Sequence, residues 1–389
     1  MAAVVSLYAK EDRCRKRNDS AGVDPVFLIL LLLLLAVGLT MLYSASYAQS
    51  EYDSGYTQTT RYLQKQAACA AIGLLVLGIT SRIPPRFWLK MAWPLYGISI
   101  LLLLSVLVFG QSVNGAKRWI NIAGLQFQPS EIAKFTMILL FAKLTTDFGP
   151  SAKEFRYGVL GFSCALLGIL IPLALEKHLS AIMLMGLVAV VMMFVAGTHP
   201  KWLLAGAGAA ALFVVVYITF MGYAGDRVTA WLHPESDPRD TGYQILQSLY
   251  AIGSGGLFGL GLGKSKQKYL YLPFQYNDYI FAVICEELGL VGAMLIASLF
   301  AALILRGYWL SLRSPDRFFT VLAAGLITLI AAQTVLNLCV VTNLLPSTGI
   351  ALPFFSYGGT ALVVNLAEMG IVLGISRYRN HAAYQEASL

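Results

Sequence analysis

Asp278 is the residue of this chain best placed to act as a base. It follows the aromatic stretch at residues 269–276 and comes directly before a long apolar run, so its carboxylate is expected at the water-facing end of a membrane helix. Aromatic neighbours can partly desolvate a carboxylate there while a substrate still reaches it, which suits a general base. The alternative is that Asp278 caps the helix by accepting backbone N–H bonds.

Two other acidic residues interrupt apolar stretches. Glu286 follows Asp278 by eight residues, roughly two helical turns, so both side chains are expected on one helix face. A charge near the bilayer centre costs about 2.5–3.5 kcal/mol on insertion scales, so Glu286 should face a wet cavity or form an interhelical hydrogen bond. Glu176 and His178 break the run between two spans. They form either a solvated hairpin tip or the polar mouth of a groove.

Cations gather in two loops that the topology below assigns to the outer side of the membrane. They are Lys117, Arg118, Lys264, Lys266 and Lys268. Because the positive-inside rule discourages such residues outside, they form a candidate site for an anionic headgroup or a diphosphate, which arginine can bind through two parallel hydrogen bonds. Simple contact with acidic lipid is the alternative.

Residues 345–360 are rich in proline and glycine and contain no Asp, Glu, Lys or Arg. This composition does not favour a helix and does not suit a solvated tail. Irregular backbone at membrane depth persists only where protein buries it or water reaches it. The segment is therefore predicted to be a re-entrant loop that lines a cavity, with a purely structural plug as the alternative.

Membrane helices must position these residues. The 389-residue chain is 58% hydrophobic and 12% charged, against a usual charged share of roughly 25%. A helical span takes about 20 apolar residues. The apolar runs predict an all-α polytopic membrane protein of about ten helices, near residues 26–46, 63–80, 89–109, 131–146, 157–175, 179–197, 202–221, 278–305, 318–341 and 361–376.

Ten spans leave both ends of the chain on one side of the membrane. With the N-terminus inside, the ends and inner loops hold 17 Lys and Arg, and the short outer loops with their adjoining span ends hold six. Both termini are therefore expected in the cytoplasm. The chain then divides into a basic tail at 1–24, a membrane domain at 25–378 with a large extracytoplasmic loop at 222–277, and a second tail at 379–389.

Several chemistries lack the residues that they need. The five cysteines and four histidines are dispersed, so neither a disulfide framework nor a zinc site is predicted, and any metal would need oxygen ligands. Residues 253–265 end in Gly-Lys-Ser, but Phe258 occupies the first glycine position of a Walker A loop. No nucleic-acid partner is expected.

Five blocks of residues together resemble the SEDS family (shape, elongation, division and sporulation). The resemblance runs from about residue 25 to 378 and is closest to the FtsW and SpoVE branch. The blocks are residues 114–120 (NGAKRWI), 128–134 (QPSEIAK), 242–263, 278–281 (DYIF) with 286–289 (EELG), and 345–359.

The resemblance implies ten transmembrane helices with a large extracytoplasmic loop between the seventh and eighth, and the activity of a peptidoglycan glycosyltransferase. In that family, lipid II, a disaccharide-peptide on undecaprenyl diphosphate, is polymerised into glycan strands at the outer face of the cytoplasmic membrane. A class B penicillin-binding protein and other divisome proteins are the implied partners. Division or sporulation is favoured over elongation.

The family's essential aspartate maps onto Asp278, which would take the proton of the acceptor's 4-hydroxyl. Lys117, Arg118 and a divalent cation such as Mg²⁺ or Mn²⁺ would neutralise the leaving diphosphate, although no residue is assigned as a metal ligand. The other candidate substrate-binding residues are Trp119, Gln128, Ser130, Lys134, Glu176, Lys264, Lys268, Glu286, Ser347, Thr348 and Ser356.

Two stretches depart from the family pattern. Residues 176–178 read Glu-Lys-His where many members have Glu/Gln-Pro-Asp, so His178 stands in place of the second acid. Residues 273–278 read Pro-Phe-Gln-Tyr-Asn-Asp where Pro-Glu-x-His-Thr-Asp is common. This second change removes an acid and an imidazole but keeps Asp278.

Two other functions stay open at this point. One is a flippase that moves lipid II across the bilayer, and the other is a catalytically silent scaffold for a penicillin-binding protein. A transporter must expose charged groups to both faces in turn, whereas the unusual polar residues of this chain concentrate on the predicted outer side.

Overall fold

The computed structural model describes residues 22–113, 116–122, 125–206, 208, 229–236, 242–314 and 316–378. Helices dominate these residues. The longer ones are α2 (Pro25–Asp53), α3 (Arg61–Thr80), α4 (Pro85–Phe109), α5 (Pro129–Phe148), α6 (Phe162–Leu175), α7 (Leu179–Val195), α10 (Tyr243–Gly255), α11 (Ile280–Leu312), α12 (Arg317–Val341) and α13 (Gly359–Ser376).

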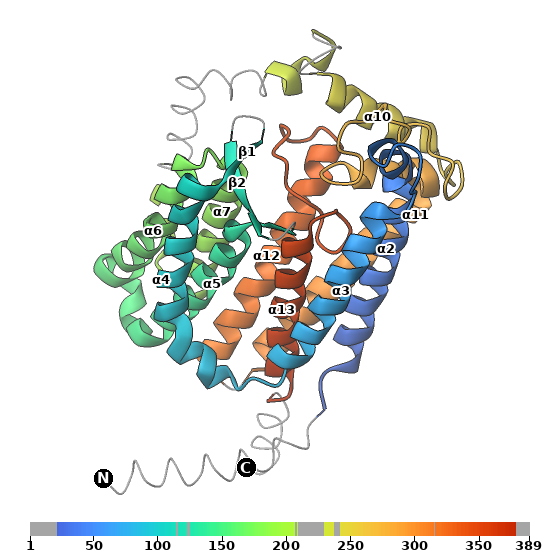
Figure 1. The fold of residues 1–389 in the computed structure, drawn as a ribbon. Coiled ribbons are helices and arrows are strands. Elements are labelled where there is room, and N and C mark those ends of the chain that lie inside the picture. Colours follow the sequence, from blue (N-terminus) through green and yellow to red (C-terminus); the bar gives the residue numbers. More distant parts are fainter. Residues whose placement is uncertain are drawn as a thin grey trace, which may run out of the picture.

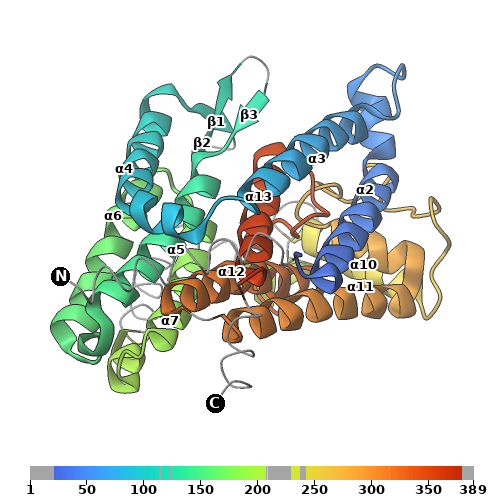
Figure 2. The same cartoon turned by 90° about the horizontal axis from the view of Figure 1, so that it is seen from below.

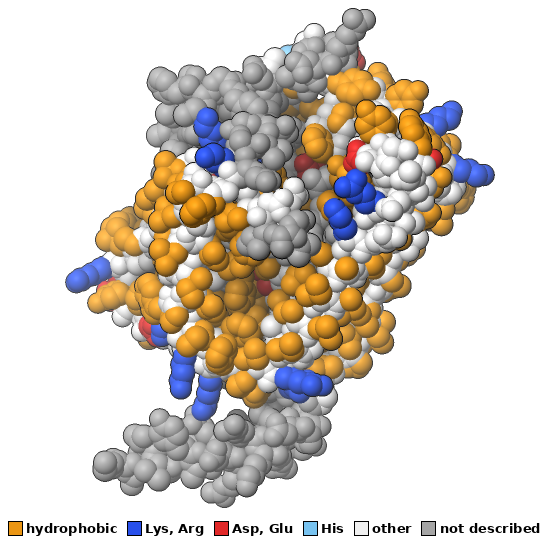
Figure 3. All heavy atoms as spheres, in the orientation of Figure 1, with side chains coloured by type: hydrophobic (Ala, Val, Ile, Leu, Met, Phe, Trp, Pro, Cys, Tyr) orange, Lys and Arg blue, Asp and Glu red, His pale blue; other side chains and the backbone are white. Residues whose placement is uncertain are grey.

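Nine of the ten predicted spans coincide with a helix in the part of the chain that the structure describes. The predicted span at 202–221 falls mostly on residues outside it. Seven helices among the described residues are long and apolar enough to cross a membrane, where α6 counts together with the π-helical turn η2 (Arg156–Gly161) before it. The chain is therefore a multi-pass membrane protein. In Figure 3 the middle of the molecular face is largely hydrophobic, with Lys and Arg toward its two ends.

A small antiparallel sheet follows α4. Its strands β1 (Gln111–Val113), β2 (Ala116–Ile122) and β3 (Leu125–Phe127) pair in the order β1-β2-β3. This sheet was not predicted, because its two outer strands have three residues each and show no alternation that could be recognised. It carries Arg118 and Trp119 over the ends of α4 and α5.

The helices form two groups around the central helices α12 and α13. Figures 1 and 2 show α4–α7 on one side and α2, α3, α10 and α11 on the other, with α13 between them. Most of the apolar window of α12 is buried, unlike that of the outer helices. α12 packs against α5, α7 and α11, so it forms the core of the described bundle.

Helices α3 and α13 approach each other closely through small residues. A Cβ atom added to Gly73 would lie 2.5 Å from Leu366, and one added to Gly370 would lie 2.1 Å from the hydroxyl of Thr80. The same hydroxyl donates to the carbonyl of Ala367 at 3.0 Å. Small residues at membrane helix interfaces permit this close backbone approach.

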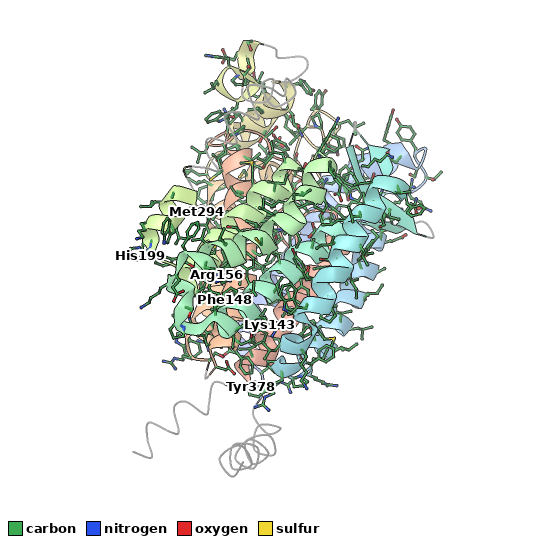
Figure 4. The ribbon with its side chains drawn as sticks, turned by 90° about the vertical axis from the view of Figure 1, so that its left-hand side faces the viewer. Lys143, Phe148, Arg156, His199, Met294 and Tyr378 are labelled. Atoms are coloured by element: carbon green, nitrogen blue, oxygen red, sulfur yellow. The ribbon has the colours of Figure 1, made fainter. Side chains whose placement is uncertain are left out.

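The first and last described helices meet at one end of the bundle. The backbone N–H of Asp24 donates to Ser376 at 3.0 Å, and the carboxylate of Asp24 pairs with Arg306 of α11 at 2.7 Å. Figure 4 shows Tyr378 at this lower end, away from α10. The two ends of the described chain therefore lie at the same end of the bundle, and the side of the membrane on which the termini lie stays a prediction. The tails at 1–21 and 379–389 lie outside the described residues.

The predicted large loop at 222–277 is only partly described. It contains the short helix η3 (Pro234–Ser236) and the amphipathic helix α10, which packs along the start of α11. The turns that follow α10 enter a break in α11 at Gly289, where φ is 68° and ψ is −170°. The break frees the carbonyls of Glu286 and Glu287, and these accept the N–H groups of Leu260 and Gly261.

Candidate active site

Asp278 lies directly before α11, half-buried, at the end of the bundle that carries α10 and the sheet. Its carbonyl accepts a hydrogen bond from Asn337 of α12 at 2.8 Å, and Asn337 also donates to Ile350 at 2.8 Å. A Cβ atom added to Gly349 would lie 3.3 Å from Oδ2 of Asp278. The carboxylate therefore faces the segment 345–358. Tyr279, not Asp278, occupies the N-cap position of α11.

The segment 345–358 is irregular, as its Pro and Gly content predicts, and protein covers residues 352–356. Ser356 donates to the carbonyl of Asn277 at 2.7 Å and accepts the N–H of Leu352 at 2.8 Å. Gln66 of α3 donates to the carbonyl of Ser356 and accepts the N–H of Gly358. These bonds satisfy the irregular backbone and fix it beside the backbone of Asp278.

The turn between α6 and α7 brings Glu176 and His178 below the sheet. Arg118 of β2 donates to the carbonyl of Lys177 at 2.8 Å, and Lys177 has a φ of 55°. Glu176 and His178 are 2% and 8% exposed. Glu176 Oε1 and His178 Nδ1 have no hydrogen-bond partner among the described residues. Glu176 and His178 are therefore buried inside the protein and do not form a solvated hairpin tip.

Burial acts strongly on both ionisable groups of this turn. It raises the pKa of the Glu176 carboxyl to about 8, although the nearby charge of Arg118 opposes the rise. It lowers the pKa of the His178 imidazole to about 3, and Arg118 and Lys134 add to that effect. Both side chains are therefore mostly uncharged at pH 7, which leaves Arg118 as the charged partner of the turn.

Lys134 and Glu131 form a buried ion pair at the start of α5. The two atoms Nζ and Oε2 are 2.7 Å apart, with the side chains 6% and 9% exposed. Both charges lie close enough to Glu368 of α13 to act on it electrostatically, and Lys134 also acts on His178. The polar cluster thus extends from the turn at 176–178 into the centre of the bundle.

The remaining predicted residues near β2 and α5 lie at the rim of this cluster. Gln128 donates to the hydroxyl of Ser130 at 3.1 Å and occupies the N-cap position of α5 without a capping bond. Ser130 is buried. The exposed Lys117 reaches back to the carbonyl of Leu107 at 3.2 Å, and Trp119 is half-buried.

Thr348 joins the segment 345–358 to α7. The hydroxyl of Ser180 donates to the carbonyl of Thr348. The hydroxyl of Thr348 is buried and has no hydrogen-bond partner among the described residues. Ser347 beside it is half-buried. Two predicted residues, Ser347 and Thr348, therefore belong to the segment that faces Asp278.

Glu286 and Glu287 bind the turn at 265–268. Glu286 accepts the hydroxyl of Ser265 and the N–H of Lys266. Glu287 accepts the hydroxyl of Ser44 at 2.7 Å and the amine of Lys268 at 3.0 Å. Both acids are fully buried. They join α2, α11 and the turn.

This arrangement changes the interpretation of two predicted residues. Lys268 is 2% exposed, so the part of the prediction that put its amine in a surface patch is wrong: the amine leaves water because Glu287 and Ser44 replace its hydration. Lys264 does lie on the surface. Of the two alternatives for Glu286, the structure shows hydrogen bonding to a neighbouring segment.

In the part of the chain that the structure describes, no group of three His, Cys, Asp or Glu side chains is arranged to hold a metal ion. The cations near the buried turn are side chains, Arg118 and Lys134. The divalent cation stays a prediction, and no chemical step below depends on it.

Sequence reasoning missed several residues of the site. Glu368 lies inside an apolar run and is 1% exposed. The high cost of an intramembrane acid is the signal that could have found it. Glu131 was not among the predicted site residues, although its pairing with Lys134 is local, at i and i+3. Asn337 and Gln66 gave no local signal, because their partners are distant in the chain.

Comparisons with known proteins agree over nearly the whole chain. Residues 25–381 match the family model described as cell cycle protein, FtsW/RodA/SpoVE. The chain is 38% identical to a probable peptidoglycan glycosyltransferase FtsW of Geobacter sp. (strain M18), covering 93% of this chain and 99% of the relative. It is 36% identical to stage V sporulation protein E of Bacillus subtilis (strain 168), covering 92% and 98%.

A solved structure shows the same fold. It is described as "Structural coordination of polymerization and crosslinking by a peptidoglycan synthase complex", and one of its chains superposes with a TM-score of 0.78 at 30% identity, covering 92% of this chain and 98% of that one. The family match spans the helices that carry Asp278, the buried cluster and the segment 345–358. This chain belongs to the FtsW/RodA/SpoVE family of cell cycle proteins.

Proposed function

We propose that this chain is a peptidoglycan glycosyltransferase that polymerises lipid II, an undecaprenyl-diphosphate disaccharide-peptide, into glycan strands. Relatives that align over nearly its whole length are named for that glycosyltransferase activity. The observation that carries the proposal is the position of Asp278. Its carboxylate lies next to the N-terminal end of the membrane helix α11 and faces an irregular segment held by protein hydrogen bonds.

In the proposed reaction, Asp278 accepts the proton of the 4-hydroxyl of the acceptor GlcNAc. The oxygen then bonds to the anomeric carbon of the donor MurNAc, and the bond from that carbon to the diphosphate breaks with inversion. The proton stays on Asp278, and the prenyl diphosphate leaves with the electron pair. A half-buried carboxylate beside aromatic residues is suited to such a base.

The leaving diphosphate gains negative charge as the bond breaks, so cations near it lower the barrier. Arg118 and Lys134 are proposed to supply that charge, with Lys117 and Lys264 at the surface as entry contacts. The unpartnered polar atoms of Glu176 and Thr348 are proposed to hydrogen-bond the saccharide. The proposed contacts of Trp119, Gln128, Ser130 and Ser347 complete this site.

The membrane, the partner protein and the cellular process are proposed from the same sequence and comparisons. The positive residues favour the cytoplasmic membrane with both termini in the cytoplasm. The similar solved complex couples polymerisation to crosslinking, which supports a class B penicillin-binding protein as partner. Relatives named for FtsW and for stage V sporulation support a role in division or sporulation.

Replacing Asp278 by Asn tests the proposal. The change removes the base but keeps the size of the side chain, and general-base catalysis contributes roughly 10²–10⁴-fold. The assay gives lipid II in detergent to the purified protein together with its transpeptidase. We expect the rate of strand synthesis to fall by about 100-fold or more. Gel analysis of labelled strands measures it.

Asp147→Asn is the matched control. Asp147 is an exposed acid at the other end of α5, paired with Lys143, and its replacement should leave synthesis unchanged. Detergent offers no membrane to cross, so synthesis there separates polymerisation from lipid transport. A fully active Asp278→Asn protein would refute the assignment of the base.

A further inference from the structure

Three tyrosine rings pack together beside the proposed base. Tyr62 comes from α3, Tyr276 from the turn before α11 and Tyr357 from the segment 345–358. The ring centroids of Tyr62 and Tyr276 are 4.6 Å apart, those of Tyr62 and Tyr357 are 4.9 Å apart, and those of Tyr276 and Tyr357 are 6.0 Å apart. All three side chains are half-buried, so part of each ring surface stays accessible.

The cluster is rigidly joined to the backbone that carries Asp278. The N–H of Tyr357 donates to the carbonyl of Tyr276 at 2.9 Å, and Ser356 donates to the carbonyl of Asn277 between Tyr276 and Asp278. Tyr276 precedes Asp278 by two residues, so their Cα atoms are at most about 7 Å apart. The backbone segments that carry the three rings are therefore hydrogen-bonded to the backbone next to the base.

Polar and charged side chains border the tyrosine cluster. The hydroxyl of Tyr62 donates to the carboxylate of Asp53 at 2.5 Å, and Arg61 acts electrostatically on Tyr357. Aromatic faces bordered by hydrogen-bonding groups suit a carbohydrate, because the C–H face of a pyranose is apolar and its rim carries hydroxyls. Single interfacial tyrosines that anchor a helix in lipid do not need three mutually packed rings from three segments.

We propose that Tyr62, Tyr276 and Tyr357 form a saccharide-stacking platform that binds a sugar unit adjoining the one whose hydroxyl Asp278 deprotonates. This inference rests on the proposed glycosyltransferase function. It gives a role to one departure from the family pattern, since Tyr276 stands where that pattern has histidine and presents a larger ring.

A binding measurement tests the platform without turnover. The protein carries Asp278→Asn throughout, and the probe is a lipid-free tetrasaccharide of alternating GlcNAc and MurNAc, titrated in detergent by calorimetry. We expect Tyr276→Ala to weaken binding on the order of 5-fold, the scale of one lost aromatic contact. Tyr276→Phe should bind as the parent does, because stacking needs the ring and not its hydroxyl.

Tyr271→Ala is the control, since Tyr271 lies in the same turn, is 57% exposed and should not affect binding. Tyr276→Leu keeps apolar volume in the cluster, so it reports on stacking if the alanine variant unfolds. Parent-like binding by Tyr276→Leu, or equal loss in Tyr271→Ala, would overturn the platform.

Polymerisation by otherwise wild-type protein separates this inference from the proposed function. We expect Tyr276→Leu to raise KM for lipid II several-fold and to shorten the strands, with kcat nearly unchanged. Tetrasaccharide binding that depends on Tyr276, in a wild-type protein that makes no strands, would retain the platform and contradict the polymerase. Strand synthesis by Tyr276→Leu with an unchanged KM for lipid II would retain the polymerase and contradict the platform.

Discussion

Burial of the turn at 176–178 shifts the pKa values of Glu176 and His178 in opposite directions. The uncharged form of a carboxyl is its acid and that of an imidazole is its base, so exclusion of water raises the pKa of the first and lowers that of the second. The sequence predicted a polar break at this place. It could not show that both groups are buried, because β2 and its Arg118 cover the turn only in the folded chain.

Replacing Glu176 by Gln should change how stability depends on pH. The folded pKa of Glu176 is raised from 4.5 to about 8. Its contribution to the free energy of unfolding is therefore full below pH 4.5 and is lost as the pH rises from 4.5 to about 8. His178, lowered from 6.5 to about 3, loses its contribution as the pH falls below 6.5. Of these two groups, only Glu176 changes its contribution between pH 6.5 and about 8.

In that window the parent protein should lose about 1.4 kcal/mol of unfolding free energy per pH unit through Glu176, and Glu176→Gln should remove this slope. Thermal unfolding in detergent at several pH values measures it. Glu154→Gln, at an exposed acid, should keep the parental slope. A Glu176→Gln protein with the parental slope would contradict the burial argument.

At the scale of elements, apolar run length predicted the spans well, because each span must satisfy its own backbone in lipid. The break in α11 was not predictable from its local sequence. Leu290 and Val291 donate across the break to the carbonyls of Gly256 and Leu257, more than thirty residues earlier in the chain. The position of Asp278 before a span left a base and a helix cap open, and the family resemblance favoured the base, which stays a prediction. The burial of Lys268 was not predictable, because it depends on Glu287 and a serine of α2.

Gly289→Ala should destabilise the protein through this break. The new Cβ would lie 2.3 Å from the nitrogen of Gly259, and the φ of 68° is strained for alanine. We expect a loss of roughly 1–3 kcal/mol from the backbone strain alone, measured by unfolding in denaturant and detergent. Gly97→Ala is the control, since a Cβ there meets nothing within 4 Å. Equal stability of the two variants would show that the break relaxes freely.

On the scale of the whole molecule, the Lys268–Glu287 ion pair joins distant parts of the chain. It connects the turn after α10 to α11, and through Ser44 to α2. The side chains are 3% and 0% exposed, so each charge depends on the other for its solvation. Charge patterning alone suggested surface lysines, because the partner carboxylate lies in a different predicted element.

Lys268→Met should leave the carboxylate of Glu287 buried without its cation. We expect a loss of about 3–5 kcal/mol of unfolding free energy. Adding Glu287→Gln should recover much of it, because the double variant has no unpaired buried charge. Unfolding of both variants in detergent measures the difference. A double variant less stable than Lys268→Met would show that the pair itself is not the source of the loss.

The bond between Asp24 and Ser376 has a topological consequence. With the ten crossings that the sequence predicts, a chain whose first and last described membrane helices are joined by a hydrogen bond behaves as a closed ring cut at one point. A short linker between those helices would let the cut be moved to another loop on the same side, giving circular permutants that thread every span in its original direction.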